Sequence, residues 1–219
     1  MLQLVSAFTI KDLGFLLKAT VVTLQLFGLA IGLGLIIGFI TGIMRTNPKS
    51  RLLRMAAGLY IEIFRSTPLM LQVIVFYFGA SLFGLDFSRG LVAGVGLFLY
   101  SGAYLGEVFR TGIQSVDRRQ WESGASLGMG YVQILANVVI PQAIRICIPP
   151  SIGFLVSLAK GTSLVSVLGY IELTRAGRLI VERTYQPFVV WGIVMAIYFV
   201  ICYPIALQGQ KLEVRFGKK

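Results

Sequence analysis

Residues 19–44 read ATVVTLQLFGLAIGLGLIIGFITGIM and contain no charged side chain. A helix needs about 20 mostly apolar residues to cross a bilayer, so this stretch predicts a membrane-spanning helix. Residues 66–85 and 184–210 are also free of charge, and two further apolar stretches carry isolated charges. The sequence therefore predicts an all-α integral membrane protein in one domain, with spans at roughly 15–43, 56–83, 90–112, 138–159 and 187–209.

The composition agrees with a membrane protein. Of the 219 residues, 56% are hydrophobic and 13% are charged, whereas a soluble domain carries about 25% charged residues. The net charge of +11 comes from basic residues that lie between apolar runs, which favours contact with lipid headgroups and argues against nucleic-acid binding. The chain has no histidine, and Cys147 and Cys202 both lie in apolar runs. We therefore predict buried free cysteines and no metal site.

The first predicted span is rich in glycine. Gly28 and Gly32, and also Gly34, Gly38 and Gly42, recur at intervals of four residues. Small residues at this spacing allow two helices to approach closely in a membrane. We predict that another helix packs on these glycines, although glycine is also simply common in membrane helices.

The distribution of basic residues predicts the orientation. Five spans put the two termini on opposite sides, and the loops of one side carry eleven basic residues against six on the other. The positive-inside rule then places the N-terminus outside and the C-terminus in the cytoplasm. The eleven are Arg45, Lys49, Arg51, Arg54, Arg110, Arg118, Arg119, Lys211, Arg215, Lys218 and Lys219.

The segment between the third and fourth spans, Asp117–Gly130, reads DRRQWESGASLGMG and is too polar to span a membrane. Asp117 and Gln120 have capping-box spacing, and Gly128 and Gly130 can end a helix. We predict a short cytoplasmic helix at about 118–127. Its small residues, at 123–126, give a surface on which another protein can pack; an ordinary surface helix is the alternative.

The same segment resembles a known signature. Glu122-Ser123-Gly124 is followed after three residues by Gly128, after nine more by Val138, and after one more by Ile140-Pro141. This spacing is similar to that of the EAA loop of ATP-binding-cassette (ABC) importer permeases. Other segments resemble the polar amino acid branch of these permeases: Phe64–Pro68 with Gln72, Ser101–Tyr104 with Glu107, Arg110–Ile113, Lys160–Leu164 and Glu172–Arg175.

The resemblance implies a subunit of an amino acid importer in a bacterial inner membrane. It implies a second permease subunit, identical or paralogous, an extracytoplasmic amino acid-binding protein, and a cytoplasmic ATPase that binds ATP with Mg²⁺. The chain lacks a Gly-x-x-x-x-Gly-Lys-Ser/Thr loop, so we expect no bound cofactor and no enzymatic activity in this chain. Contact with the ATPase is then expected through Glu122, Ser123, Gly124, Ala125 and Gly128.

Ionisable residues within a span are costly and mark either a functional site or a paired structural one. Glu62, Arg65, Glu107 and Arg145 all fall in the cytoplasmic half of the predicted spans. One interpretation pairs Glu62 with Arg65, and Glu107 with Arg145 or Arg110. In the other, part of this belt contacts the transported amino acid. The candidate substrate pathway comprises Arg65, Thr67, Gln72, Ser101, Glu107 and Lys160.

Prolines are the remaining feature of the spans. Pro68 is expected to free a backbone carbonyl and kink the second span, and Pro149-Pro150 to do the same in the fourth. Lys160, at the outer end of the fourth span, is expected to act as an interface anchor or as part of an outer gate.

Two other classes of protein share some of these features. An ion-driven secondary transporter or channel subunit would explain the spans and the charges but not the EAA spacing. An intramembrane enzyme would need a nucleophile with a base, or a metal site, for which the sequence offers no candidates.

Overall fold

The computed structural model describes the backbone of residues 7–216 and the side chains of residues 7–214. Within these limits all regular secondary structure is helical, which confirms the predicted fold class. Lys218, Lys219 and the side chain of Arg215, which contributed to the predicted orientation, lie outside the described residues. The elements are α1 Ile10–Thr46, α2 Arg51–Ser66, α3 Leu69–Leu82, α4 Arg89–Gln114, α5 Arg118–Ser126, α6 Tyr131–Ile134, η1 Leu135–Val139, α7 Ile140–Gly161, η2 Thr162–Leu168, α8 Leu173–Thr184 and α9 Pro187–Phe216.

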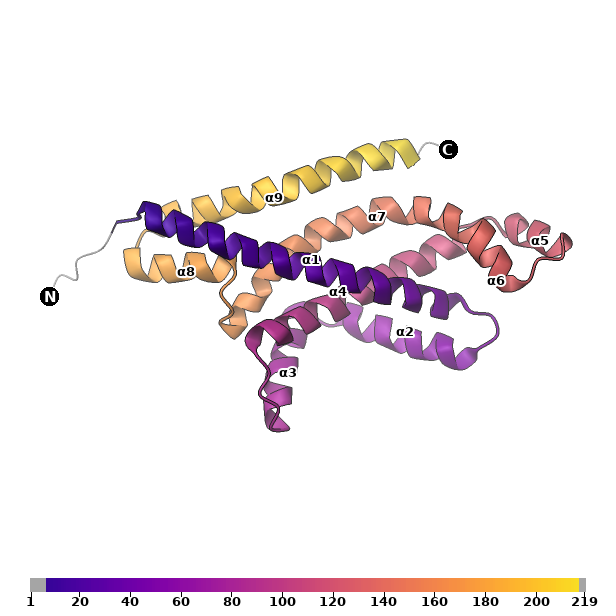
Figure 1. Ribbon diagram of the computed structural model, residues 1–219, viewed down its shortest axis with the longest axis horizontal. Coiled ribbons are helices and arrows are strands. Elements are labelled where there is room, and N and C mark those ends of the chain that lie inside the picture. Colours follow the sequence, from indigo (N-terminus) through magenta and orange to yellow (C-terminus); the bar gives the residue numbers. More distant parts are fainter. Residues whose placement is uncertain (1–6, 217–219) are drawn as a thin grey trace.

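The long helices run along the long axis of the molecule (Figure 1). Four helical stretches of the described chain are long and apolar enough to span a membrane, and α2 with α3 makes a fifth candidate. The helices extend beyond the ranges predicted from hydropathy because apolar runs mark only the part inside hydrocarbon, whereas a helix continues through polar ends. The four stretches are Ile10–Thr46, Arg89–Gln114, Tyr131–Leu168 and Pro187–Val214.

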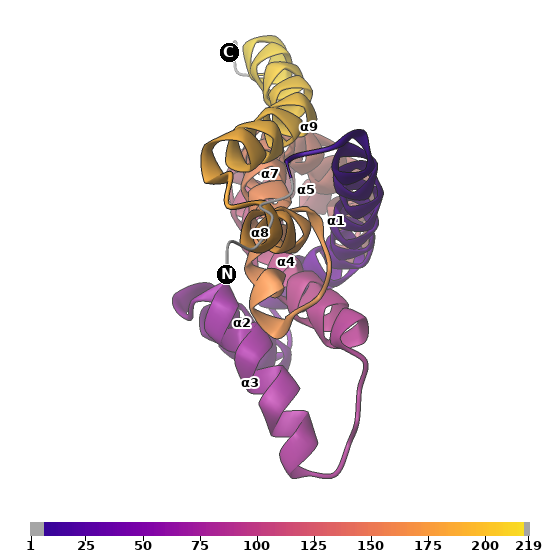
Figure 2. The ribbon, with the colours of Figure 1, turned by 90° about the vertical axis from the view of Figure 1, so that its left-hand side faces the viewer.

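The second predicted span, 56–83, is not one continuous helix. It consists of α2 and α3, which meet at a bend of 107°. Thr67, directly before Pro68, has an extended backbone with φ −113° and ψ 144°, as expected for a residue whose helical conformation clashes with the following proline ring. Pro68 also lacks the N–H that would continue the helix. The predicted kink is therefore a full break, and α3 leaves the bundle of long helices (Figures 1 and 2).

The fourth span behaves in the opposite way. Pro149 and Pro150 lie inside α7, which continues as a helix through both of them from Ile140 to Gly161, so no break like that at Pro68 occurs here. The irregularity lies earlier, in the π-helical turn η1, where the Ile140 N–H donates to the Leu135 carbonyl. Pro141 follows at once and cannot donate to a carbonyl of the preceding turn, so this wider turn accommodates it.

The packing of α1 against α4 depends on three glycines. A Cβ atom on Gly34 would lie 2.1 Å from Ser101 Oγ, and a Cβ atom on Gly38 would lie 2.7 Å from Leu105 Cβ. A Cβ atom on Gly42 would lie 2.7 Å from Phe109 Cβ. Nothing lies within 4 Å of the corresponding position at Gly28 or Gly32. Of the two predicted glycine surfaces, only the second therefore packs against another helix among the described residues.

The two ends of the bundle carry different elements. The α1–α2 turn, α5 and α6 lie at one end, and α8 lies at the other with the starts of α1 and α9 (Figure 1). Arg183 near the end of α8 pairs with Asp12 in the first turn of α1, which ties these elements together.

Candidate functional site

The short helix α5 occupies Arg118–Ser126 within the predicted 118–127 segment. Asp117 caps it by accepting a hydrogen bond of 2.9 Å from the Arg119 N–H. The predicted capping box does not form through Gln120, because the Gln120 side chain instead accepts a bond of 3.4 Å from Gln142 Nε2.

A glycine in a left-handed conformation ends α5. Gly128 has φ +78°, which L side chains rarely adopt. The Met129 N–H donates to the Gly124 carbonyl at 3.1 Å and the Gly128 N–H donates to the Ala125 carbonyl at 2.9 Å, which is the Schellman arrangement. Gly128 therefore sets the direction in which the chain leaves α5.

One face of α5 packs on the chain itself. Gly124 is buried, and a Cβ atom there would lie 2.8 Å from Ile134 Cγ1 of α6. Trp121 stacks on Tyr131 with ring centroids 5.6 Å apart. Gly124 thus allows α5 to lie close to α6, so its contribution to any partner contact is indirect.

The opposite face of α5 is open. Glu122, Ser123 and Ala125 are exposed, and Glu122 pairs with exposed Arg118 at 2.9 Å. A shallow hollow of about 550 Å³ lies on this face, lined by Arg119, Glu122, Ser123, Ser126 and Leu127. The arrangement is that of a short helix held rigidly on one side and available to a partner on the other.

Gln72 closes the break between α2 and α3. Its Nε2 donates to the Phe64 carbonyl at 2.8 Å, to the Thr67 carbonyl at 3.0 Å and to Thr67 Oγ1 at 2.8 Å. The break leaves these carbonyls without helical partners, and an unpaired buried carbonyl is costly. Gln72 therefore stabilises the break, and its own Oε1 is buried without a partner among the described residues.

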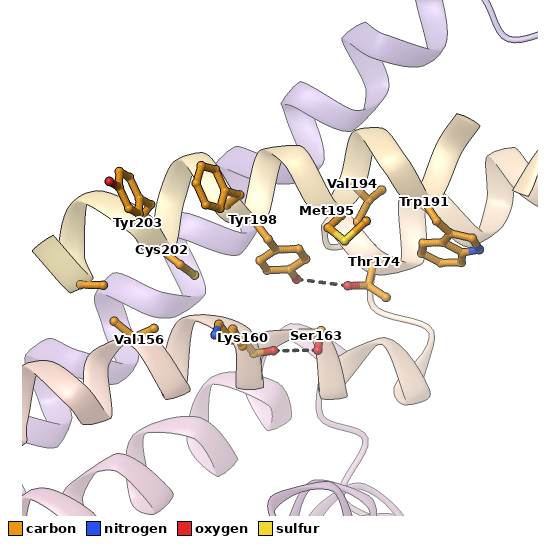
Figure 3. A pocket seen from close by; sticks show the side chains of 12 residues that line it. Val156, Lys160, Ser163, Thr174, Trp191, Val194, Met195, Tyr198, Cys202 and Tyr203 are labelled. Carbon is orange, nitrogen blue, oxygen red and sulfur yellow. Dashed lines mark hydrogen bonds between the residues drawn. The ribbon is translucent and has the colours of Figure 1, made fainter. Parts of the chain in front are cut away.

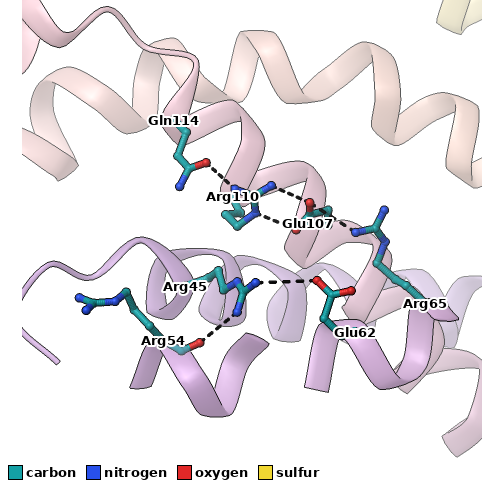
Figure 4. A network of polar contacts seen from close by, with 7 residues as sticks. All are labelled: Arg45, Arg54, Glu62, Arg65, Glu107, Arg110 and Gln114. Atoms are coloured by element: carbon teal, nitrogen blue, oxygen red, sulfur yellow. Dashed lines mark hydrogen bonds and ion pairs between the residues drawn. The ribbon is translucent and has the colours of Figure 1, made fainter. Parts of the chain in front are cut away.

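The intramembrane charges form a network that joins α1, α2 and α4 (Figure 4). Glu107 lies at its centre, 2.6 Å from Arg110 Nη2 and 3.4 Å from Arg65 Nη1. Glu62 lies 3.8 Å from Arg45 Nη2. The expected pair between Glu62 and Arg65 does not form, because each side chain reaches a different helix.

Two further contacts place Arg65. Its guanidinium lies 5.4 Å from the centroid of the Tyr104 ring, within the range of a cation–π interaction. Its Nε is buried without a hydrogen-bond partner in the described chain. Arg145 is exposed and, within the described residues, forms no ion pair, so the alternative pairing of Glu107 with Arg145 is wrong.

Ser101 serves in helix packing. It is fully buried, and its hydroxyl donates to the Ala30 carbonyl of α1 at 2.6 Å. In this conformation α1 covers the Ser101 side chain, and its assignment to the pathway stays a prediction.

Lys160 lies away from the other pathway candidates, in a groove of about 690 Å³ between α7 and α9 that also includes Tyr198 and Cys202 (Figure 3). Cys202 is well inside α9, and the helical stretch continues beyond Lys160 to Leu168. Lys160 lies in the last turn of α7, and its role as an interface anchor or as part of an outer gate stays a prediction.

A buried carboxylate at the start of α8 was not predicted as a site residue. Glu172 is fully buried and accepts bonds of 2.9 Å and 2.7 Å from the N–H groups of Thr174 and Arg175. The Tyr198 hydroxyl donates to it from α9 at 3.3 Å. The available signal was a glutamate directly before a polar helix, in the position of an N-terminal cap.

An all-helical bundle with a broken span, an intramembrane charge network and a separate polar helix at one end has the features of a multi-pass membrane transport subunit. A family model described as binding-protein-dependent transport system inner membrane component matches residues 30–209. The chain belongs to this family, whose members are the permease subunits of ABC importers.

Similar proteins support the same family. A putative glutamine transport system permease protein of Rickettsia felis is 33% identical over 91% of both chains. An arginine transport system permease protein of Bacillus subtilis is 30% identical over 94% of both chains. The structure of an amino acid ABC transporter crystallised with histidines is 32% identical, with a TM-score of 0.87 over 94% of this chain and 96% of that chain.

Family membership confirms the expected localisation and the expected non-enzymatic role of this chain. The chain is a multi-pass inner-membrane protein and a non-enzymatic subunit, and a separate ATPase hydrolyses ATP. The family also implies a substrate-binding protein as a partner. The secondary-transporter alternative is not favoured.

Proposed function

We propose that this chain imports amino acids as the permease subunit of an ABC importer. The observation that carries the proposal is similarity along nearly the whole chain to permease proteins for glutamine, arginine and L-cystine. These three substrates share the α-amino and α-carboxylate groups and differ in their side chains. The common zwitterionic part is therefore the proposed object of recognition.

Coupling to the ATPase is assigned to the open face of α5. Glu122, Ser123 and Ala125 form the contact, and Gly124 and Gly128 hold the helix in place by packing and by ending it. ATP with Mg²⁺ binds to the ATPase. Two observations support this assignment. The helix α5 is capped and exposed on one face, and its other face packs on α6 through the stacked rings of Trp121 and Tyr131.

The break between α2 and α3 is the proposed centre of the translocation pathway. Thr67 is exposed at this break, Gln72 closes it, and Arg65 precedes it by one turn. Glu107 holds Arg65 from α4, so a cation and an anion lie close to the break, as recognition of a zwitterion requires. Lys160 belongs to a separate part of the proposed pathway.

A second permease subunit, identical or paralogous, completes the pathway in this proposal. Support comes from α3, whose Met70, Leu71, Val75 and Phe78 are exposed where this helix leaves the bundle. We also propose that the N-terminus lies outside and the C-terminus in the cytoplasm, since the α1–α2 turn and α5 share the basic end of the bundle.

The test is reconstitution of the chain with its ATPase and its binding protein. ATP hydrolysis is then measured with a panel of amino acids and with sugars as controls. We expect one or more amino acids to stimulate hydrolysis and to accumulate in vesicles. Stimulation by sugars alone, or accumulation without ATP, would contradict the proposal.

A further inference from the structure

Three arginines surround a hollow beside the α1–α2 turn. The hollow has a volume of about 340 Å³ and is lined by Arg45, Arg51, Arg54 and Met55. The nearest acidic partner in the described chain is Glu62, which is 60% exposed and pairs only with Arg45, at 3.8 Å. The hollow therefore carries uncompensated positive charge.

Backbone carbonyls hold Arg54 in place, and Arg45 is held by one carbonyl together with the exposed Glu62 carboxylate. Arg54 Nη1 donates to the carbonyls of Asn47 and Pro48 at 2.6 Å and 3.0 Å. Arg45 Nη1 donates to the Arg54 carbonyl at 3.4 Å (Figure 4). Bonds to carbonyls fix a guanidinium group without neutralising it, so Arg54 keeps its charge. In the described chain Arg45 is balanced only by exposed Glu62, which leaves net positive charge available to an anion.

The bare backbone of Gly58 makes room for this arrangement. A Cβ atom there would lie 1.5 Å from Arg45 Nη1, so any other residue would displace the guanidinium. Arg51 completes the hollow from the first turn of α2; it is exposed and forms no ion pair among the described residues.

An apolar stripe on α2 begins at the hollow. Leu52, Met55, Leu59 and Ile63 recur every three or four residues, which places them on one helix face, and each is between 50% and 76% exposed. Met55 belongs to both the hollow and the stripe. An anionic group bound in the hollow would thus lie at one end of an apolar surface that extends along α2.

We propose that the hollow binds the phosphate headgroup of an anionic phospholipid, with an acyl chain lying along the α2 stripe. Basic clusters at the cytoplasmic end of a spanning helix attract anionic lipids, and the guanidinium fork matches phosphate geometry. The assignment of the cytoplasmic leaflet rests on the orientation proposed above. The combination of charge and apolar stripe favours a lipid over a free phosphate ion.

The experiment uses the full chain in detergent, without ATPase or amino acid, so that failure of the importer assay leaves it unaffected. Phosphatidylglycerol, phosphatidylcholine with the same acyl chains, and inorganic phosphate are titrated separately. Bound lipid is counted by native mass spectrometry, and the thermal midpoint is followed. We expect phosphatidylglycerol to bind most tightly and to raise the midpoint.

Arg51→Gln should weaken phosphatidylglycerol binding about fivefold, because an exposed arginine can be replaced without disturbing the turn. The matched control is Lys211→Gln, which removes one exposed charge from α9 and should have no such effect. Equal losses in both variants would overturn the proposal, as would equal affinity for phosphatidylcholine or for inorganic phosphate. A disulfide between two copies of Leu59→Cys would also overturn it, since a second copy would then cover the stripe.

Discussion

Arg65 of α2 and Glu107 of α4 face each other with Nη1 and Oε1 3.4 Å apart, one turn before the break at Pro68. The ion pair is not isolated, because Arg110 donates two hydrogen bonds to the same carboxylate at 2.8 Å and 2.6 Å. Arg110 also bonds to Gln114 in the last turn of α4. Glu107 thus connects the broken span to the helix that leads directly into α5.

The geometry predicts unequal effects of neutralising the two residues. Glu107→Gln leaves two arginines without a carboxylate, whereas Arg65→Gln leaves Glu107 bonded to Arg110. Loss of a hydrogen bond to a charged group costs about 1.5–3 kcal/mol, so Glu107→Gln should lower the thermal midpoint more.

Measurements of transport and of ATP hydrolysis distinguish a structural role of Arg65 from contact with the substrate. If Arg65 contacts the amino acid, Arg65→Gln should assemble with the ATPase and retain basal hydrolysis but lose substrate stimulation. Normal stimulation in Arg65→Gln would remove this residue from the pathway. In the double variant Arg65→Gln/Glu107→Gln, an effect on the thermal midpoint that differs from the sum of the two single effects shows that the two residues interact.

The end of α5 should respond to two different glycine substitutions. Gly124→Leu would collide with Ile134 and should weaken ATPase binding by lifting α5 from α6. Gly128→Ala meets no atom within 4 Å but imposes strain at φ +78°, which costs about 1 kcal/mol. Gly128→Ala should therefore lower stability slightly and retain more coupling than Gly124→Leu. Co-purification with the ATPase measures this, and equal binding by both variants would show that the seat on α6 is not needed.

Gln72 should be required for the shape of the α2–α3 break. Gln72→Leu removes a donor from three acceptors and leaves the partly buried Phe64 carbonyl without that partner, which costs up to about 1–3 kcal/mol. The matched control is Thr67→Val, which removes only one of the acceptors. We expect Gln72→Leu to lower the midpoint and transport strongly and Thr67→Val to do so weakly. A similar response of the two variants would argue against this role.

Neighbouring glycines of α1 provide a matched test of packing against α4. Gly34→Ala places a methyl group 2.1 Å from Ser101 Oγ, whereas Gly32→Ala meets nothing within 4 Å. Overpacking typically costs about 1–3 kcal/mol, so only Gly34→Ala should lower the thermal midpoint. If both variants behave alike, the close approach of α1 and α4 is not maintained in the membrane.

Cysteine labelling tests the proposed orientation. Pro48→Cys and Asp86→Cys introduce thiols at exposed positions in the α1–α2 turn and in the α3–α4 connection. An impermeant reagent added to intact cells should label Asp86→Cys and leave Pro48→Cys unlabelled. The reverse pattern would invert the orientation, and labelling of both would contradict the number of spans.

Much of the fold followed from local sequence properties. Long uncharged runs predicted the candidate spans because hydrocarbon excludes charge over a fixed thickness. The short α5 helix was predictable since Asp117 and Gly128 act within a few residues of themselves. The prolines were harder to interpret: Pro68 breaks its span and Pro149 does not, although both remove a backbone donor.

The partners of the charged residues could not be inferred in the same way. Glu62 and Arg65 have the spacing of a helical pair, yet Glu62 bonds to α1 and Arg65 to α4. Likewise Ser101 fitted a pathway residue by sequence, but its hydroxyl is covered by α1.

The sequence by itself determined that this protein crosses a membrane, which apolar stretches are candidate spans, and which short polar segment resembles an EAA loop. These properties depend on composition and on spacing along the chain. Only the tertiary structure decided that Glu107 holds Arg65 and Arg110 together, that Gln72 closes the broken span, and that Gly124 seats α5 on α6. The physical reason is that each of these contacts joins separate helices, and their relative position depends on how whole helices pack and not on the residues beside each partner.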